Sequence, residues 1–206
     1  MNQKNRAHIM RLTGLGLLTA VVIVLQLLGS FIRFGPFSIS LVLIPIVVGT
    51  ALYGYAAGGW LGFVFGMAVL LSGDAAAFLA VHIPGTVITV LAKGIAAGVA
   101  AGLVFRLFSK KSTFWATVAA AVVCPIVNTG VFLLGCLAFF MPTVREWAMA
   151  FGFGDNAGAY MIVGLVGLNF VAEFVINVVL VPAIVQIIRI GQKRYHTGVK
   201  NNDSGN

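Results

Sequence analysis

GDAAAFLAVHIPGTVITVLAKGIAAGVAAG, residues 73–102, is the stretch around which the rest of the chain is organised. It begins with an acidic residue, Asp74, in a short irregular segment, and after a break at 82–85 it becomes an apolar helix with Lys93 near its middle. A charged side chain in the membrane interior costs at least about 2.5–3.5 kcal/mol. Lys93 is therefore expected to face the interior of a helical bundle that the rest of the chain forms.

The composition indicates an integral membrane protein. Of the 206 residues, 60% are hydrophobic and 9% are charged, which is more apolar surface than a soluble domain can bury. A spanning helix needs about 20 residues, so the chain has room for five or six spans. The net charge of +8 does not indicate nucleic-acid binding, because the basic residues gather at the two ends and in one loop, as membrane topology requires.

The apolar runs predict an all-α, six-helix membrane bundle. The segment 72–84 is too short and too polar to span, and 141–157 is predicted to be a polar-aromatic loop. Pro45 is expected to kink the second span, and Pro125 to interrupt the fifth. The predicted spans are 12–32, 39–55, 57–71, 85–105, 114–140 and 158–188. Residues 1–11 then form the N-terminus, 12–190 the membrane domain and 191–206 a polar tail.

The distribution of positive charge favours six spans with both termini in the cytoplasm. Lys and Arg concentrate on the cytoplasmic side of membrane proteins. With six spans, only Arg33 and Arg145 fall outside and Lys93 lies within the membrane, whereas an odd number would place the basic C-terminal segment outside. The cytoplasmic residues are then Lys4, Arg6, Arg11, Arg106, Lys110, Lys111, Arg189, Lys193, Arg194 and Lys200.

Small residues at every fourth position predict close helix contacts, since they let two helix backbones approach each other. Gly16 and Ala20 in the first span leave two interpretations open, namely packing inside this protein and docking of a partner subunit. Two longer rows favour tight internal packing. They are Gly58, Gly62 and Gly66 in the third span and Gly94, Gly98 and Gly102 in the fourth.

Polar residues late in the chain predict an internal polar site. Asn169, Glu173 and Asn177 are spaced by four residues, so they share one face of the last span. Lys93 and Asn128 add polar groups from the fourth and fifth spans, and polar groups at this depth point inward. One interpretation is a ligand pocket lined by these five residues. The alternative is a Lys93–Glu173 ion pair that only holds helices together.

For the other candidate site residues, a structural role explains the sequence as well as a functional one does. Asp74 is a candidate cap of a short helix at 75–79 or part of a gate over the pocket, and His82 is a loop residue or part of the same gate. Without a second His or Cys at ligand spacing, neither a metal site nor a cofactor is expected. Cys124 and Cys136 are predicted to be packing residues, because a helix would hold them about 18 Å apart.

Signatures of enzymes are missing from the sequence. It contains no nucleophile elbow, no paired His on a helix and no phosphate-binding glycine loop, and its glycines have packing spacing instead. Uphill movement of a solute would therefore draw its energy from an ion gradient or from partner subunits.

The whole pattern resembles the substrate-binding S components of energy-coupling factor (ECF) vitamin transporters. The resemblance covers 11–194 and rests on six spans in about 200 residues, on the first helix with Gly16 and Ala20, and on the run GDAAAFLA…GTVITVLAKG. It implies a multi-pass protein of the bacterial cell membrane that captures a vitamin and docks on a transmembrane coupling subunit with two ATPases. ATP hydrolysis would then belong to those partners, and this chain would not be an enzyme.

The resemblance also implies roles for individual residues. An alanine pair in the first helix of the family contacts the coupling subunit, and Gly16 and Ala20 stand at the matching positions here, with one departure from the pair. The loops 33–38 and 72–84 correspond to lids over the substrate, so Arg33, Asp74 and His82 become candidate gate residues.

Among vitamins, pantothenate is the predicted substrate. A buried lysine with several amides suits a ligand that carries a carboxylate, hydroxyls and an amide. Riboflavin is the alternative, although Tyr53, Trp60, Trp115 and Trp147 are not grouped with the polar stripe. We expect Lys93 to bind the substrate carboxylate.

Three functions of other classes remain open. A proton-driven secondary transporter would use Glu173 as its proton carrier, although no clear inverted repeat is present. A membrane scaffold without a ligand would leave Lys93 and Glu173 paired directly. An intramembrane enzyme ranks last, because no nucleophile and base stand together.

Overall fold

The fold is a bundle of helices with one short hairpin. The computed structural model describes residues 3–31, 33–34, 37–38 and 41–200. In chain order the elements are α1 (Gln3–Gly29), β1 (Arg33–Phe34), β2 (Phe37–Ser38), α2 (Leu43–Tyr53), α3 (Tyr55–Leu71), α4 (Ala76–Leu79), α5 (Ile83–Ser109), α6 (Thr113–Gly135), the π-helix η1 (Cys136–Phe140), α7 (Met141–Ala150), α8 (Ala157–Ala159), the π-helix η2 (Tyr160–Leu165), α9 (Gly167–Val179) and α10 (Val181–Lys200). The strands pair antiparallel, with Arg33 opposite Ser38.

Several helices are long and apolar enough to cross a membrane, which confirms the predicted class of integral membrane bundle. Three such helices are found among the described residues, at His8–Gly29, Ile83–Ser109 and Thr113–Ala150. A fourth span is possible by length and composition if Ala157–Leu165 and Gly167–Val179, which meet at 43°, count as one. The count of six and the cytoplasmic placement of both termini stay predictions, because α2, α3 and the apolar part of α10 are shorter.

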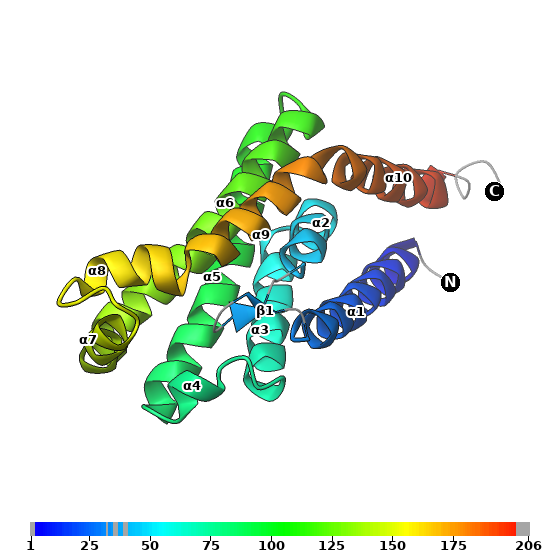
Figure 1. Cartoon of the computed structure of the whole chain (residues 1–206). Helices are drawn as coiled ribbons and strands as arrows, with labels where there is room; N and C mark the ends of the chain where they lie inside the picture. Colours follow the sequence, from blue (N-terminus) through cyan, green and yellow to red (C-terminus); the bar gives the residue numbers. More distant parts are fainter. Residues whose placement is uncertain (1–2, 32, 35–36, 39–40, 201–206) are drawn as a thin grey trace.

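Helix α5 is the centre of the bundle, with α3 on one side and α6 on the other (Figure 1). The glycine rows of α3 and α5 face each other. A Cβ added at Gly62 would collide with the carbonyl oxygen of Gly94, and one added at Gly98 would collide with the carbonyl oxygen of Gly58. The close approach predicted from the glycine spacing is therefore confirmed, and it places Lys93 against α3.

The fifth and sixth spans differ from the prediction. Residues 141–150 are helix α7 and not a loop, because the chain continues from α6 through η1 without leaving the helical state. The sixth span is not continuous either, since it breaks at Val166 and again at Leu180. The polar residues of α9 therefore lie on a short helix of their own.

The two prolines do not act as predicted. Pro45 does not kink a span, because it lies in the first turn of α2, where a backbone N–H has no helical acceptor in any case. Pro125 lies inside α6, and the helix runs through it from Thr113 to Gly135.

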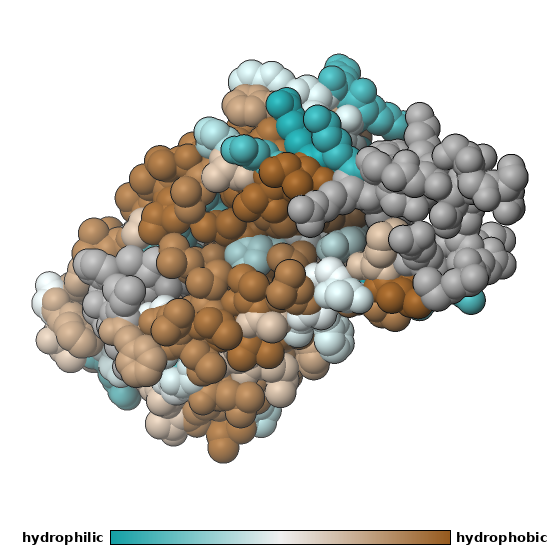
Figure 2. All heavy atoms as spheres, turned by 90° about the vertical axis from the view of Figure 1, so that its right-hand side faces the viewer, coloured by the Kyte–Doolittle hydropathy of each residue, from teal (hydrophilic) through white to brown (hydrophobic). Residues whose placement is uncertain are grey.

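Helix α1 lies at the edge of the bundle, beside α2 and α3 (Figure 1). Gly16 and Ala20 are exposed, and a Cβ at Gly16 would meet nothing within 4 Å. This excludes the interpretation that the pair packs inside the protein. Large apolar side chains, among them Leu17 at 67% exposure, surround the pair. The view from this side is largely hydrophobic, as expected of a face covered by lipid or by a partner (Figure 2).

Candidate functional site

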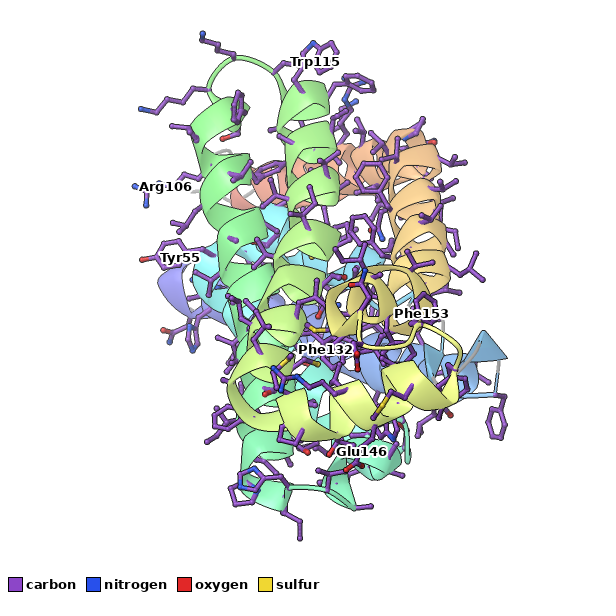
Figure 3. All side chains as sticks on the ribbon, turned by 60° about the vertical axis from the view of Figure 1, so that its left-hand side comes forward. Tyr55, Arg106, Trp115, Phe132, Glu146 and Phe153 are labelled. Carbon is purple, nitrogen blue, oxygen red and sulfur yellow. The ribbon has the colours of Figure 1, made fainter. Side chains whose placement is uncertain are left out.

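A cavity of about 60 Å³ lies between α3, α5, α6 and α9. A water molecule needs about 10–15 Å³ in the same measure, so the cavity holds a few waters and must widen to admit a vitamin. Phe132, one of its wall residues, lies between the end of the molecule marked by Trp115 and the end marked by Glu146 (Figure 3). The lining residues are Val69, Asp74, Ala75, Phe78, Thr86, Thr89, Val90, Lys93, Asn128, Thr129, Phe132, Phe140, Val166, Asn169, Phe170 and Glu173.

Lys93 reaches this cavity from the middle of α5. Its ammonium nitrogen lies 5.6 Å from the ring centroid of Phe65 and 5.4 Å from that of Phe132, which are cation–π distances. It also interacts electrostatically with Glu173 and, more weakly, with Asp74. The lysine is thus held by two rings and attracted by two carboxylates at the wall of a cavity.

Helix α9 brings two of its three predicted polar residues to the cavity. Glu173 is 3% exposed and accepts a long hydrogen bond of 3.4 Å from Asn169 Nδ2. Asn177 is not among the lining residues, and its Nδ2 donates at 2.8 Å to the backbone carbonyl of Glu173. The structure therefore brings together Lys93, Asn128, Asn169 and Glu173 and leaves Asn177 one turn away.

Asp74 belongs to the cavity wall. Its carboxylate accepts a hydrogen bond from Gln26 Nε2 of α1, which also reaches Ser72 Oγ at 3.4 Å. The capping interpretation of Asp74 is wrong, because α4 begins after Ala75 and has no side-chain cap. Gln26, 1% exposed, was expected only to bond somewhere inside the bundle, and the structure shows that it fixes a carboxylate of the site.

His82 is the N-cap of α5, the helix that carries Lys93. Its Nδ1 accepts a hydrogen bond of 3.0 Å from the backbone N–H of Gly85. Its ring stacks on Phe139, with centroids 6.0 Å apart. His82 therefore fixes the start of α5, and it is not among the residues that line the cavity.

We expect His82→Ala to lower stability by about 0.5–1.5 kcal/mol, because the N–H of Gly85 loses its acceptor. The replacement His82→Asn keeps a side-chain acceptor at the cap and should stay close to the wild type. Thermal unfolding of the purified protein in detergent measures both. Equal unfolding temperatures for the alanine and asparagine variants would show that the cap contributes nothing.

Four phenylalanines form an aromatic wall that the sequence did not reveal. Phe78 meets Phe132 and Phe140 edge to face, with centroids 5.5 and 5.0 Å apart, and Phe170 joins them in lining the cavity. Trp147 does not line the cavity, but it packs on Phe78 with ring centroids 5.3 Å apart. The sequence predicts no aromatic residues beside the polar stripe, but this prediction considers only Trp and Tyr. Four phenylalanines line the cavity, so the prediction is wrong for phenylalanine.

Three polar atoms of the cavity wall are buried without a hydrogen-bond partner among the described residues. They are Thr89 Oγ1, Asn128 Oδ1 and Asn169 Oδ1. A buried polar group without a partner costs about 1–3 kcal/mol, so such groups mark a place where a ligand or water completes the bonding. The cavity thus presents hydrogen-bond acceptors beside one ammonium group.

The remaining candidates have simpler outcomes. The backbone of Arg33 lies in β1, and its side chain is outside the described part of the structure, so its gate role stays a prediction. Cys124 and Cys136 are buried free thiols, as predicted. No group of three or more metal-binding side chains occurs within the described residues.

A comparison with protein families places this geometry in context. Residues 10–185 match the family model described as "ECF transporter, substrate-specific component". Neither the search of curated proteins nor that of solved structures returned a match. Proteins of the matched family are membrane-embedded substrate-binding subunits and not enzymes. Because the match covers most of the chain, this protein belongs to the family of substrate-specific components of ECF transporters.

Proposed function

We propose that the cavity captures pantothenate from outside the cell for import by an ECF transporter. One observation carries the proposal: the ammonium group of Lys93 stands in a cavity whose Asn128, Asn169 and Thr89 side chains offer unused hydrogen-bond acceptors. Pantothenate has a carboxylate for the lysine and hydroxyl and amide donors for these acceptors. Its uncharged carbon chain would lie against the phenylalanine wall.

The family supports the wider setting of the proposal. A substrate-specific component implies a substrate and transporter partners. We propose that α1 is the helix that meets the coupling subunit, with Gly16 and Ala20 at the contact. Their exposure on an apolar face supports this assignment. Both termini would then face the cytoplasm, where the ATPases act.

Calorimetry on the purified, detergent-solubilised protein tests the substrate. A panel of vitamins is titrated, and pantothenate is compared with its alcohol analogue, in which –CH₂OH replaces the carboxylate. We expect pantothenate to bind tightly and the analogue to bind at least about 30-fold more weakly, because a buried charge pair contributes about 2 kcal/mol or more. Equal affinities for pantothenate and its alcohol analogue would show that the cavity does not recognise the carboxylate.

Riboflavin is the second candidate, and the aromatic wall is the observation that favours it. A flavin ring could stack against Phe78, Phe132, Phe140 or Phe170, and offset stacking contributes about 0.5–1.5 kcal/mol per ring pair. Tight binding of riboflavin in the same panel, with none of pantothenate, would keep the capture function and replace its substrate.

A further inference from the structure

We propose that a groove at the turn between α5 and α6 binds one anionic phospholipid. The headgroup of this lipid lies against Lys111, and one acyl chain lies along Trp115, Val118 and Ala119 of α6. The groove shares no lining residue with the substrate cavity. The inference therefore goes beyond the proposed function, and neither depends on the other.

The groove is open and mostly apolar. Its volume is about 340 Å³, against about 60 Å³ for the substrate cavity. Its lining residues are Phe108, Lys111, Trp115, Val118 and Ala119. Trp115 is 64% exposed, so its ring borders a hollow that the described part of the chain leaves uncovered. Val118 is half-buried, because it packs against the buried cluster that contains Val181 and Val185 of α10. The bundle therefore fixes one side of the groove.

The groove starts at the boundary of the membrane. Helix α5 ends at Ser109 and α6 begins at Thr113, and both belong to helices that are long and apolar enough to cross a membrane. The short turn between them must therefore lie near one membrane surface. Trp115 stands at this end of the molecule (Figure 3), and tryptophan is enriched at the depth of the lipid headgroups.

Positive charge gathers at the membrane-surface end of the groove. Lys111 lines the groove, Lys110 precedes it in the same turn, and both side chains are exposed. No acidic residue occurs in the sequence between positions 75 and 145, so no neighbour along the chain balances these charges. The first turn of α6 also lacks an acidic residue, which leaves the positive end of its helix dipole without a counter-charge. The turn therefore attracts an anion.

The shape of the groove favours an anion that carries an apolar chain. Trp115, Val118 and Ala119 are spaced by three and four residues, so they form one face of α6 that leads from the charged turn into the membrane. This face rises about 6 Å from Trp115 to Ala119. A soluble phosphate would leave the apolar face uncovered, and a neutral lipid would leave the lysines without a counter-charge. An anionic phospholipid satisfies both, as in other basic pockets between membrane helices.

Native mass spectrometry of the full chain in detergent measures lipid binding directly. The probes are phosphatidylglycerol, phosphatidylcholine with the same acyl chains, and glycerol 1-phosphate as a headgroup without chains. We expect one phosphatidylglycerol to bind at least about fivefold more tightly than phosphatidylcholine, since each basic residue near the membrane surface contributes about that factor. Glycerol 1-phosphate should not displace the bound lipid, because it cannot cover the apolar face.

Three variants locate the lipid. Lys111→Gln removes the charge at the groove and should weaken phosphatidylglycerol binding by about fivefold. Ala119→Trp fills the groove with a large side chain, so it should lower phosphatidylglycerol binding although both lysines remain. Arg106→Gln is the matched control, because Arg106 is an exposed cation near the same end of α5 that does not line the groove and points away from α6 (Figure 3). It should bind phosphatidylglycerol as the wild type does. Thermal unfolding without added lipid checks that each variant is folded.

Four outcomes would overturn the lipid site. Equal affinities for the two lipids would show that the groove does not recognise negative charge, and displacement by glycerol 1-phosphate would show a site for soluble anions. The same loss in Arg106→Gln and Lys111→Gln would show a general effect of surface charge. If Ala119→Trp keeps its lipid but no longer assembles with the coupling subunit and ATPases, the groove is a protein interface. Each outcome leaves pantothenate capture untouched.

Discussion

Replacing Lys93 with methionine is expected to weaken pantothenate binding by about 2–5 kcal/mol, which is roughly 30-fold or more in the dissociation constant. The variant removes the only ammonium group among the described lining residues, and the substrate carboxylate would then face Asp74 and Glu173 without a cation. Methionine has a similar length and keeps the contact with Phe65 and Phe132. Calorimetry on wild type and variant measures the difference, and Lys110→Met, an exposed lysine at the end of α5, is the matched control.

A double variant separates binding from stability. Removing one partner of a buried ion pair costs about 3–5 kcal/mol, because the other charge stays buried alone. Lys93→Met could therefore unfold the protein for a purely structural reason. Lys93→Met combined with Glu173→Gln removes both charges and should regain much of the lost stability without regaining pantothenate binding. Full pantothenate affinity in either variant would show that Lys93 and Glu173 form only a structural pair.

Replacing Gly62 with alanine is expected to destabilise the bundle by about 1–3 kcal/mol. The added Cβ would collide with the carbonyl group of Gly94, and the main chain cannot rotate away as a side chain does. Helices α3 and α5 must then separate, and α5 moves with Lys93. Thermal unfolding and pantothenate binding should both be impaired in the same sample.

Replacing Gly130 on α6 with alanine should leave the stability of the bundle unchanged or raise it. A Cβ there meets nothing within 4 Å, and alanine favours a helix over glycine by up to about 1 kcal/mol. Gly130→Ala should therefore unfold at the same temperature as the wild type or above it. If both variants lose the same amount of stability, the collision of a Cβ at Gly62 with α5 is not the cause of the destabilisation.

Much of the site was predictable because intramembrane polar residues are few and must face inward. That constraint singled out Lys93, Asn128, Asn169 and Glu173, all of which line one cavity. The wall of Phe78, Phe132, Phe140 and Phe170 was not predictable, since phenylalanine inside an apolar helix looks the same whether it faces lipid, core or cavity. Gln26 gave a weak signal as a lone polar residue, but its partner on the α3–α4 turn is 48 positions away in sequence.

The sequence by itself determined that the chain is a membrane bundle and that the glycine rows of α3 and α5 make close helix contacts, because composition and four-residue spacing act locally along each helix. That the two rows meet each other was decided by the tertiary structure. Only the tertiary structure decided which polar groups share the cavity. Breaks at Val166 and Leu180 make α9 a separate short helix, which brings Asn169 and Glu173 to the cavity and leaves Asn177 outside. Gly164, Gly167 and Pro182 stand beside these breaks, but the residues that α9 brings to the cavity depend on its packing against α6, which is distant in sequence.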